Sequence, residues 1–247
     1  MGAWAAYGLG ADSRDLPAFV VLHSQWSGPK VDQPLYHRLW GAGFLPAEHQ
    51  GVLLRSQGDP VLFLQDGGGV TRAVRAQQLA TMAELNAAAS ERFRDPGIAA
   101  RQQQAELAFR MQAAVPQLVD LGTESAEVMA LYGPAAQTRG TFANNALLAR
   151  RLLERGVRCV QIYHRGWDQH RDLELDLPKQ CGDIDQPIAA LLIDLRRRGL
   201  LEDTLVVWTS EFGRTVYAQG DLDGTSYGRD HHPRCFVTWL AGGGVRA

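Results

Sequence analysis

The segment "TFANNALLARRLLERGVRCVQIYH" (residues 141–164) decides the fold class, because it passes from a helical pattern directly into a strand pattern. Thr141 is a suitable N-cap, apolar residues recur at spacings of three and four, and Gly156 is a typical helix end. "VRCVQIYH" (157–164) is then apolar along much of its length, which is typical of a strand covered on both faces. The segment therefore predicts a helix followed by a strand of a parallel sheet.

The rest of the chain extends this alternation. Strands that alternate with helices favour an α/β fold, here a mostly parallel sheet flanked by helices. We predict one domain over residues 1–247, with a helical insertion near 70–132. The further predicted strands are 16–23, 52–55, 61–64, 204–212 and 235–242, and the further predicted helices are two within 70–131 and one over 183–199.

Composition excludes several classes of protein. With 25 basic and 27 acidic residues, the chain lacks the excess of basic residues that nucleic-acid binding requires. No apolar run approaches the roughly 20 residues needed to cross a bilayer, so no membrane span is predicted. The first residues, "MGAWAAYGLGADSRD", lack the charged start and apolar core of a signal peptide.

Three polar clusters lie at or beside the ends of predicted strands. "HRGWDQH" (164–170) and "SEFGRT" (210–215) each follow an apolar strand, and "GRDHHP" (228–233) precedes the last strand. Each cluster alone is common in solvated loops. Because ligand sites of open α/β sheets lie beyond the carboxyl ends of the strands, we expect the three clusters to converge there.

Carboxylates and imidazoles gathered at one edge are typical of a divalent metal site with one position open for substrate. The planar guanidinium of Arg214 would bind an anionic substrate oxygen there. His164 either hydrogen-bonds a ligand from outside the metal shell or simply ends its strand. Asp183 is expected to be an acidic residue at a helix start. The candidate metal ligands are Asp168, His170, Glu211 and one or both of His231 and His232.

The chain resembles the family catalogued as domain of unknown function 1501, which is often labelled sulfatase-like. The likeness covers nearly all of the sequence. It is carried by "GAWAAYGLG", "GFLPAEHQGVLLRSQGDPVLFL", "FANNALLARRLLERGVRCVQIYHRGWDQH", "LPKQCGDIDQPIAALLIDLRRRGLLEDTLVVWTSEFGRT" and "GRDHHP". The resemblance extends to the alkaline phosphatase and sulfatase superfamily and implies its fold.

That wider resemblance also implies a set of ligands. Asp168 and His170 match the superfamily's first Asp and His pair, although their spacing is tighter. Glu211 and Phe212 stand where the superfamily has Asp and His. His231 or His232 matches the later His of the superfamily. With one ligand replaced by phenylalanine, the resemblance implies one divalent metal, which would be zinc, calcium or manganese.

The implied activity is metal-dependent hydrolysis of sulfate or phosphate esters, with a small anionic ester or a sulfated or phosphorylated carbohydrate as the partner. Members of the family are exported to the periplasm or cell surface. Relative to them, this chain is expected to be an interior fragment, incomplete at both ends and without the nucleophile segment. The alternative is a noncatalytic exported binding or structural protein on the same fold.

Overall fold

The computed structural model describes residues 1–28, 34–62, 64–210, 212–220, 224 and 226–246. Within these residues the chain is mixed α/β, with six α-helices and a three-stranded parallel sheet. It divides into two compact units. Unit 1 comprises Met1–His23, Leu35–Thr123 and Arg151–Tyr163, and unit 2 comprises Ser24–Pro34, Glu124–Arg150 and His164–Ala247.

The three-stranded sheet has the order β2-β1-β3, with β1 (Phe19–Ser24) between β2 (Val52–Leu54) and β3 (Cys159–His164). Residues 19–22 of β1 are at most 2% exposed, as expected for a central parallel strand. Helix α1 (Gly2–Leu9) packs against this strand, since Ala6 and Phe19 share one buried cluster. The strands predicted around 16–23, 52–55 and 157–164 are therefore confirmed.

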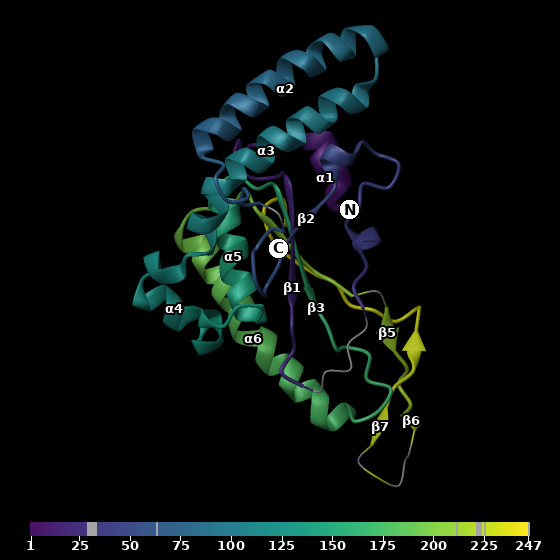
Figure 1. Cartoon of the computed structure of the whole chain (residues 1–247). Coiled ribbons are helices and arrows are strands. Elements are labelled where there is room, and N and C mark those ends of the chain that lie inside the picture. Colours follow the sequence, from purple (N-terminus) through teal and green to yellow (C-terminus); the bar gives the residue numbers. More distant parts are fainter. Residues whose placement is uncertain (29–33, 63, 211, 221–223, 225, 247) are drawn as a thin grey trace. The chain divides into compact units, whose positions relative to one another are not determined.

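Helices α2 (Arg72–Phe93) and α3 (Pro96–Val119) form the two predicted helices as a hairpin within unit 1 (Figure 1). The Thr71 hydroxyl accepts the Val74 amide at the start of α2, and Asp95 caps α3 in the same way. Helix α3 buries Met111, Val115 and Leu118, whereas α2 has no buried residue. Most of the hairpin is therefore open to solvent.

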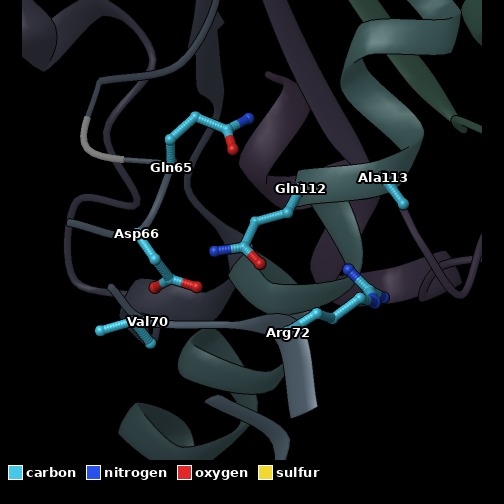
Figure 2. Close-up of a pocket in the computed structure, with 6 residues that line it drawn as sticks. All are labelled: Gln65, Asp66, Val70, Arg72, Gln112 and Ala113. Carbon is cyan, nitrogen blue, oxygen red and sulfur yellow. The ribbon is translucent and has the colours of Figure 1, made fainter. Parts of the chain in front are cut away.

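A shallow polar cavity of about 330 Å³ lies where the hairpin meets the preceding loop (Figure 2). The carboxylate of Asp66 is paired there with Arg75 at 2.5 Å, and Gln112 donates to the Leu64 carbonyl. The cavity belongs to unit 1, and none of the predicted site residues lines it. Its lining residues are Gln65, Asp66, Val70, Arg72, Gln112 and Ala113.

Helix α5 (Phe142–Glu154) begins as predicted, because Thr141 Oγ1 accepts the Asn144 amide at 3.1 Å. In unit 2, α4 (Ala126–Tyr132) contacts α6 (Leu173–Arg197). Buried polar groups join these elements. The Asp194 carboxylate of α6 pairs with Arg150 at 3.0 Å and accepts the Tyr132 hydroxyl at 3.2 Å.

Helix α6 begins ten residues earlier than the predicted start at 183, so that boundary was wrong. The segment "LELDLPKQ" (173–180) alternates apolar and polar residues and contains a proline, which obscures its helical nature. Acidic Glu174 and Asp176 in the first turn favour a helix there through the helix dipole.

The largest correction concerns the C-terminal strands. Strand β4 (Leu205–Trp208) pairs antiparallel with β9 (Trp239–Gly242), with Val207 opposite Leu240. In the described part of the chain this pair is separate from the three-stranded sheet. Parallel neighbours need a crossover connection, usually a helix. The described residues between β4 and β9 instead form short antiparallel pairs, so the chain returns in the opposite direction.

Those short pairs form a nested hairpin. Strand β5 (Gly213–Arg214) pairs with β8 (His231–His232), and β6 (Gln219–Gly220) pairs with β7 (Tyr227–Gly228).

The strand predicted over 61–64 is also wrong where it is described, since residues 61, 62 and 64 lie outside any strand.

The remaining helical elements of the described chain are short 3-10 turns: η1 (His37–Leu39), η2 (Ala47–His49), η3 (Leu121–Thr123) and η4 (Pro134–Gln137).

No helix within the described ranges has both the length and the apolar composition for a membrane crossing.

Candidate metal centre

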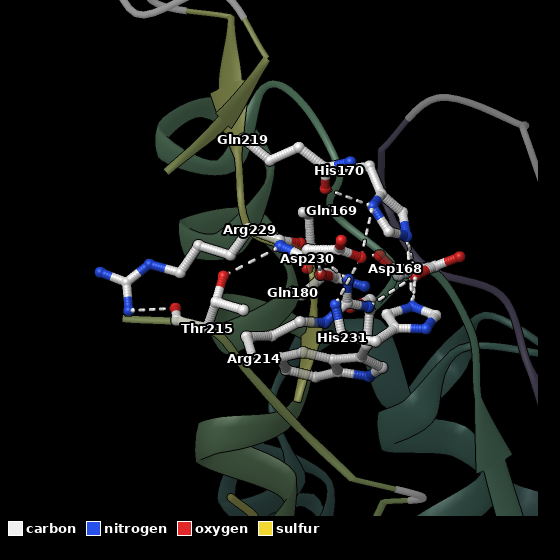
Figure 3. A network of polar contacts seen from close by, with 12 residues as sticks. Asp168, Gln169, His170, Gln180, Arg214, Thr215, Gln219, Arg229, Asp230 and His231 are labelled. Carbon is white, nitrogen blue, oxygen red and sulfur yellow. Dashed lines mark hydrogen bonds and ion pairs between the residues drawn. The ribbon is translucent and has the colours of Figure 1, made fainter. Parts of the chain in front are cut away.

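Two parts of unit 2 supply the candidate site: the loop that follows β3 and the nested hairpin. Asp168 and His170 lie in the loop, and the His170 amide donates to the Asp168 carbonyl at 2.9 Å. The β5–β8 pairing places His231 directly opposite Arg214. Residues that the sequence separates by more than forty positions thereby come together (Figure 3).

The side chains of Asp168, His170 and His231 converge on one point. The Oδ1 atom of Asp168 lies 3.0 Å from His170 Nε2 and 2.8 Å from His231 Nε2. The two Nε2 atoms are 3.2 Å apart. Each side chain is about one-third exposed, at 31, 36 and 38%. The cluster is therefore reachable by a small ion and its ligand.

This triangle fits a metal shell in size and chemistry. Ligand atoms about 2.0–2.1 Å from a tetrahedral zinc ion lie roughly 3.3 Å from one another. The three separations of 2.8–3.2 Å are slightly smaller, so a small outward movement of the side chains would produce one face of such a shell. The fourth corner would then remain for water or substrate.

Arg214 contacts the cluster through the carboxylate of Asp168. Its Nη2 atom donates to Asp168 Oδ1 at 2.6 Å and to the Trp167 carbonyl at 3.0 Å, and Nη1 donates to the Arg229 carbonyl at 3.0 Å. Partial burial raises the pKa of Asp168, but hydrogen bonds from His231 and Arg214 and the charge of Arg214 outweigh this and hold the pKa below its usual value. The carboxylate is therefore ionised at neutral pH.

Only one of the two adjacent histidines faces Asp168. Successive residues of a strand point to opposite faces, so only one of His231 and His232 can face Asp168. His231 does so, and the His232 ring instead accepts the Arg234 amide through Nδ1 at 3.3 Å. The other predicted carboxylate ligand, Glu211, lies outside the described residues.

Gln219 is a site residue that sequence reasoning missed. Its Oε1 atom lies 2.7 Å from Nδ1 of His170, on the side of the ring away from the cluster. The position of Gln219, directly before Gly220 in β6, is the only sequence signal, and a single glutamine carries no distinctive motif.

Comparison with known proteins assigns the chain to a family. All of residues 1–247 match the family described as "Protein of unknown function (DUF1501)". The chain belongs to this family. No curated protein and no solved structure matches it. The description of the DUF1501 family names no activity.

The backbone around the cluster is closely packed. A Cβ atom on Gly228 would lie 2.2 Å from the carbonyl carbon of His170. The main chain of β7 therefore packs directly against the loop that carries Asp168 and His170. Thr215, which is 3% exposed, accepts the Asp230 amide through Oγ1 and donates its own amide to the Asp230 carbonyl. Strands and loop therefore hold the three side chains of the cluster in place.

The loop is also tied to α6. Gln180 of α6 is fully buried; its amide nitrogen donates to the Arg165 carbonyl, and its oxygen accepts from Gln169. Gly166 has a φ of +93°, and a Cβ there would meet the Gln180 side chain at 2.7 Å. This turn requires glycine because of both its backbone conformation and its close packing.

His164 contacts none of the three cluster side chains. Its side chain is 6% exposed, lies against the rings of Phe142 and Trp167, and has Asp183 Oδ2 at 3.8 Å from Nε2. Burial lowers the pKa of His164, and the charge of Asp183 offsets part of that effect. Asp183 was expected at a helix start but lies within α6, where its carboxylate accepts the Ser27 amide at 2.8 Å.

Proposed function

We propose that Asp168, His170 and His231 bind a divalent metal ion and that the protein uses it to hydrolyse sulfate or phosphate esters. The observation that carries the proposal is the convergence of Asp168 Oδ1, His170 Nε2 and His231 Nε2 within 3.2 Å of one another. Two imidazoles and one carboxylate with an open fourth corner are a ligand set typical of catalytic zinc.

The ligand set favours zinc over the other two candidate ions. Imidazole nitrogen suits zinc, whereas calcium takes six to eight oxygen ligands and manganese prefers oxygen-rich sites. When bound, the ion would polarise an ester oxygen and lower the pKa of a bound water. Asp168 and the two histidines would hold it, and their partial exposure would let an anionic ester approach.

Arg214 has one role supported by its contacts and one that stays a prediction. Its bonds to Asp168 and to the Trp167 carbonyl support a role in fixing the carboxylate toward the ion. Stabilising the charge that develops on the ester is the second role, and it requires a guanidinium nitrogen to turn toward the substrate.

A noncatalytic cation-binding role is the alternative. The observation that favours it is that the Arg214 guanidinium is bonded to protein oxygens rather than directed at an open position. On that reading the ion would stabilise the hairpin for binding a partner.

The test compares two neighbouring histidines. We expect zinc titrated calorimetrically into the wild-type protein to bind once, His231→Ala to lose most of the affinity, and His232→Ala to retain it. Equal losses in the two variants would refute the ligand assignment. Turnover of 4-nitrophenyl phosphate or sulfate with added zinc, absent in His231→Ala, would support hydrolysis. Zinc binding without turnover would favour the noncatalytic role.

A further inference from the structure

The two ring nitrogens of His170 face different partners. Nε2 points at Asp168 and His231, whereas Nδ1 lies 2.7 Å from Oε1 of Gln219. An amide oxygen can only accept a hydrogen bond, so this contact requires a proton on Nδ1. In the tautomer with that single proton, the lone pair of Nε2 points into the cluster, where Asp168 Oδ1 competes for a proton at 3.0 Å.

We propose that Gln219 is a positioning residue that holds His170 in the Nδ1-protonated tautomer, so that Nε2 is free to bind the cation. This inference rests on the proposed metal site and adds the control of its histidine ligand. A ligating histidine needs an unprotonated nitrogen toward the metal, and an acceptor on its other nitrogen orients the ring and increases its basicity.

Among the described residues, Gln219 is the best-placed acceptor for this nitrogen. The nearest carboxylate on the same side, Asp230, has its Oδ1 atom 4.0 Å from Nδ1, beyond hydrogen-bond distance, and that oxygen accepts the His231 amide at 2.7 Å. The Gln219 bond to Nδ1 is shorter and lies between groups that are only partly exposed.

The fold explains why Gln219 reaches His170. In the β6–β7 pair, Gln219 lies directly opposite Gly228, the residue whose main chain touches the carbonyl carbon of His170. The β6–β7 pair therefore carries Gln219 and also packs against the loop that carries His170. A side chain at Gly228 would push that loop away from the strand pair.

Two substitutions of Gln219 test whether its side chain acts as a hydrogen-bond acceptor. Glu at position 219 can accept but not donate when ionised, and Leu can do neither. We expect Gln219→Glu to keep or increase zinc affinity and Gln219→Leu to reduce it roughly 10- to 100-fold, the usual range for such outer partners. Gln104→Leu, an exposed position in α3, is the matched control and should bind zinc like the wild type.

A second measurement needs no metal, but it removes Asp168, the acceptor that competes at Nε2. In zinc-free Asp168→Ala, long-range ¹H–¹⁵N correlation spectra of the His170 ring should show the proton on Nδ1, with Gln219 or with Gln219→Glu. Adding Gln219→Leu should give a mixture of tautomers. Recovery of affinity and tautomer by Glu also excludes a general folding defect as the cause of the Leu phenotype.

The outcomes distinguish the inference from the function on which it rests. A His170 ring protonated on Nε2 in Asp168→Ala, or zinc affinity that is unchanged in Gln219→Leu, would overturn the role of Gln219 while leaving the metal site intact. Failure of the wild type to bind zinc would overturn the metal site itself. Loss of zinc affinity in Gln219→Glu equal to that in Gln219→Leu would also overturn the accepting role.

Discussion

The Nε2 atoms of His170 and His231 lie 3.2 Å apart, although the two histidines are 61 positions apart in the sequence. Asp168 Oδ1 lies within 3.0 Å of both atoms, so three potential ligand atoms face one another. A bound cation would interact favourably with all three, and the unfolded chain does not bring them together. The pair therefore predicts that metal binding and folding are coupled.

Zinc should stabilise the folded protein. A ligand that binds only the folded state adds about 2.7 kcal/mol to the free energy of unfolding at 100 times its dissociation constant. We expect a rise in the thermal midpoint with zinc for the wild type and His232→Ala, reversed by a chelator. His231→Ala should show little or no rise. A rise of equal size in His231→Ala would place the bound ion elsewhere.

Arg214→Lys should weaken zinc binding. Lysine keeps the charge but cannot donate at once to Asp168, Trp167 and Arg229 as the guanidinium does. We expect the pKa of Asp168 to rise and the zinc dissociation constant to increase severalfold, measured by carboxyl NMR titration and calorimetry. Sulfate titration of the same variant tests the anion-binding role, which unchanged sulfate affinity would contradict.

Asp194→Asn should strongly destabilise unit 2. The carboxylate is 2% exposed and is bonded by Arg150, Arg198 and Tyr132. Removing one partner from a buried ion pair typically costs about 3–5 kcal/mol, because the remaining charge loses its compensation. Urea unfolding measures this.

The matched control for Asp194→Asn is the exposed pair of Arg197 with Glu127, whose side chains are 56 and 78% exposed. Glu127→Gln should leave the urea midpoint nearly unchanged, since exposed pairs contribute little. Similar midpoints for the two variants would show that the buried network is not important for stability.

His164 should make stability depend on pH. Its pKa is lowered in the folded state, so the unfolded chain binds the proton more readily. The stability associated with the neutral ring is complete above the unfolded value of about 6.5 and is lost as the pH falls below it. We expect thermal midpoints to fall less between pH 7.5 and 5.5 in His164→Phe than in the wild type.

The control is His37→Phe, at an exposed position in η1, which should follow the wild type. If His164→Phe also follows the wild type over this pH range, burial of a neutral His164 ring does not limit acid stability.

The local patterns of the sequence predicted the local structure well. Apolar spacing predicted α2 and α3, and Thr141 predicted the start of α5. The polar residues after β3 were expected to converge, and Asp168 and His170 do lie 3.0 Å apart. Local patterns did not predict which strands pair when they lie far apart in the sequence. Whether β4 has a parallel or an antiparallel partner depends on the path of the chain between the two strands, and the sequence of β4 itself does not indicate that path.

The same limit applies to the site. Adjacent His231 and His232 have equal chemistry, and only the pairing of β5 with β8 decides which one faces Asp168. Gln219 reaches His170 through tertiary contact alone. The alkaline phosphatase-like fold and the export expected from the family stay predictions.

The pairing of Arg214 with His231 also has an evolutionary consequence. Because strand side chains alternate between faces, inserting or deleting one residue between Gly228 and His231 would turn the imidazole away and present its neighbour instead. Single-residue insertions there should be far more damaging than conservative substitutions at nearby exposed positions. A library of insertions, screened for zinc retention, should therefore show a gap in tolerance confined to these few positions.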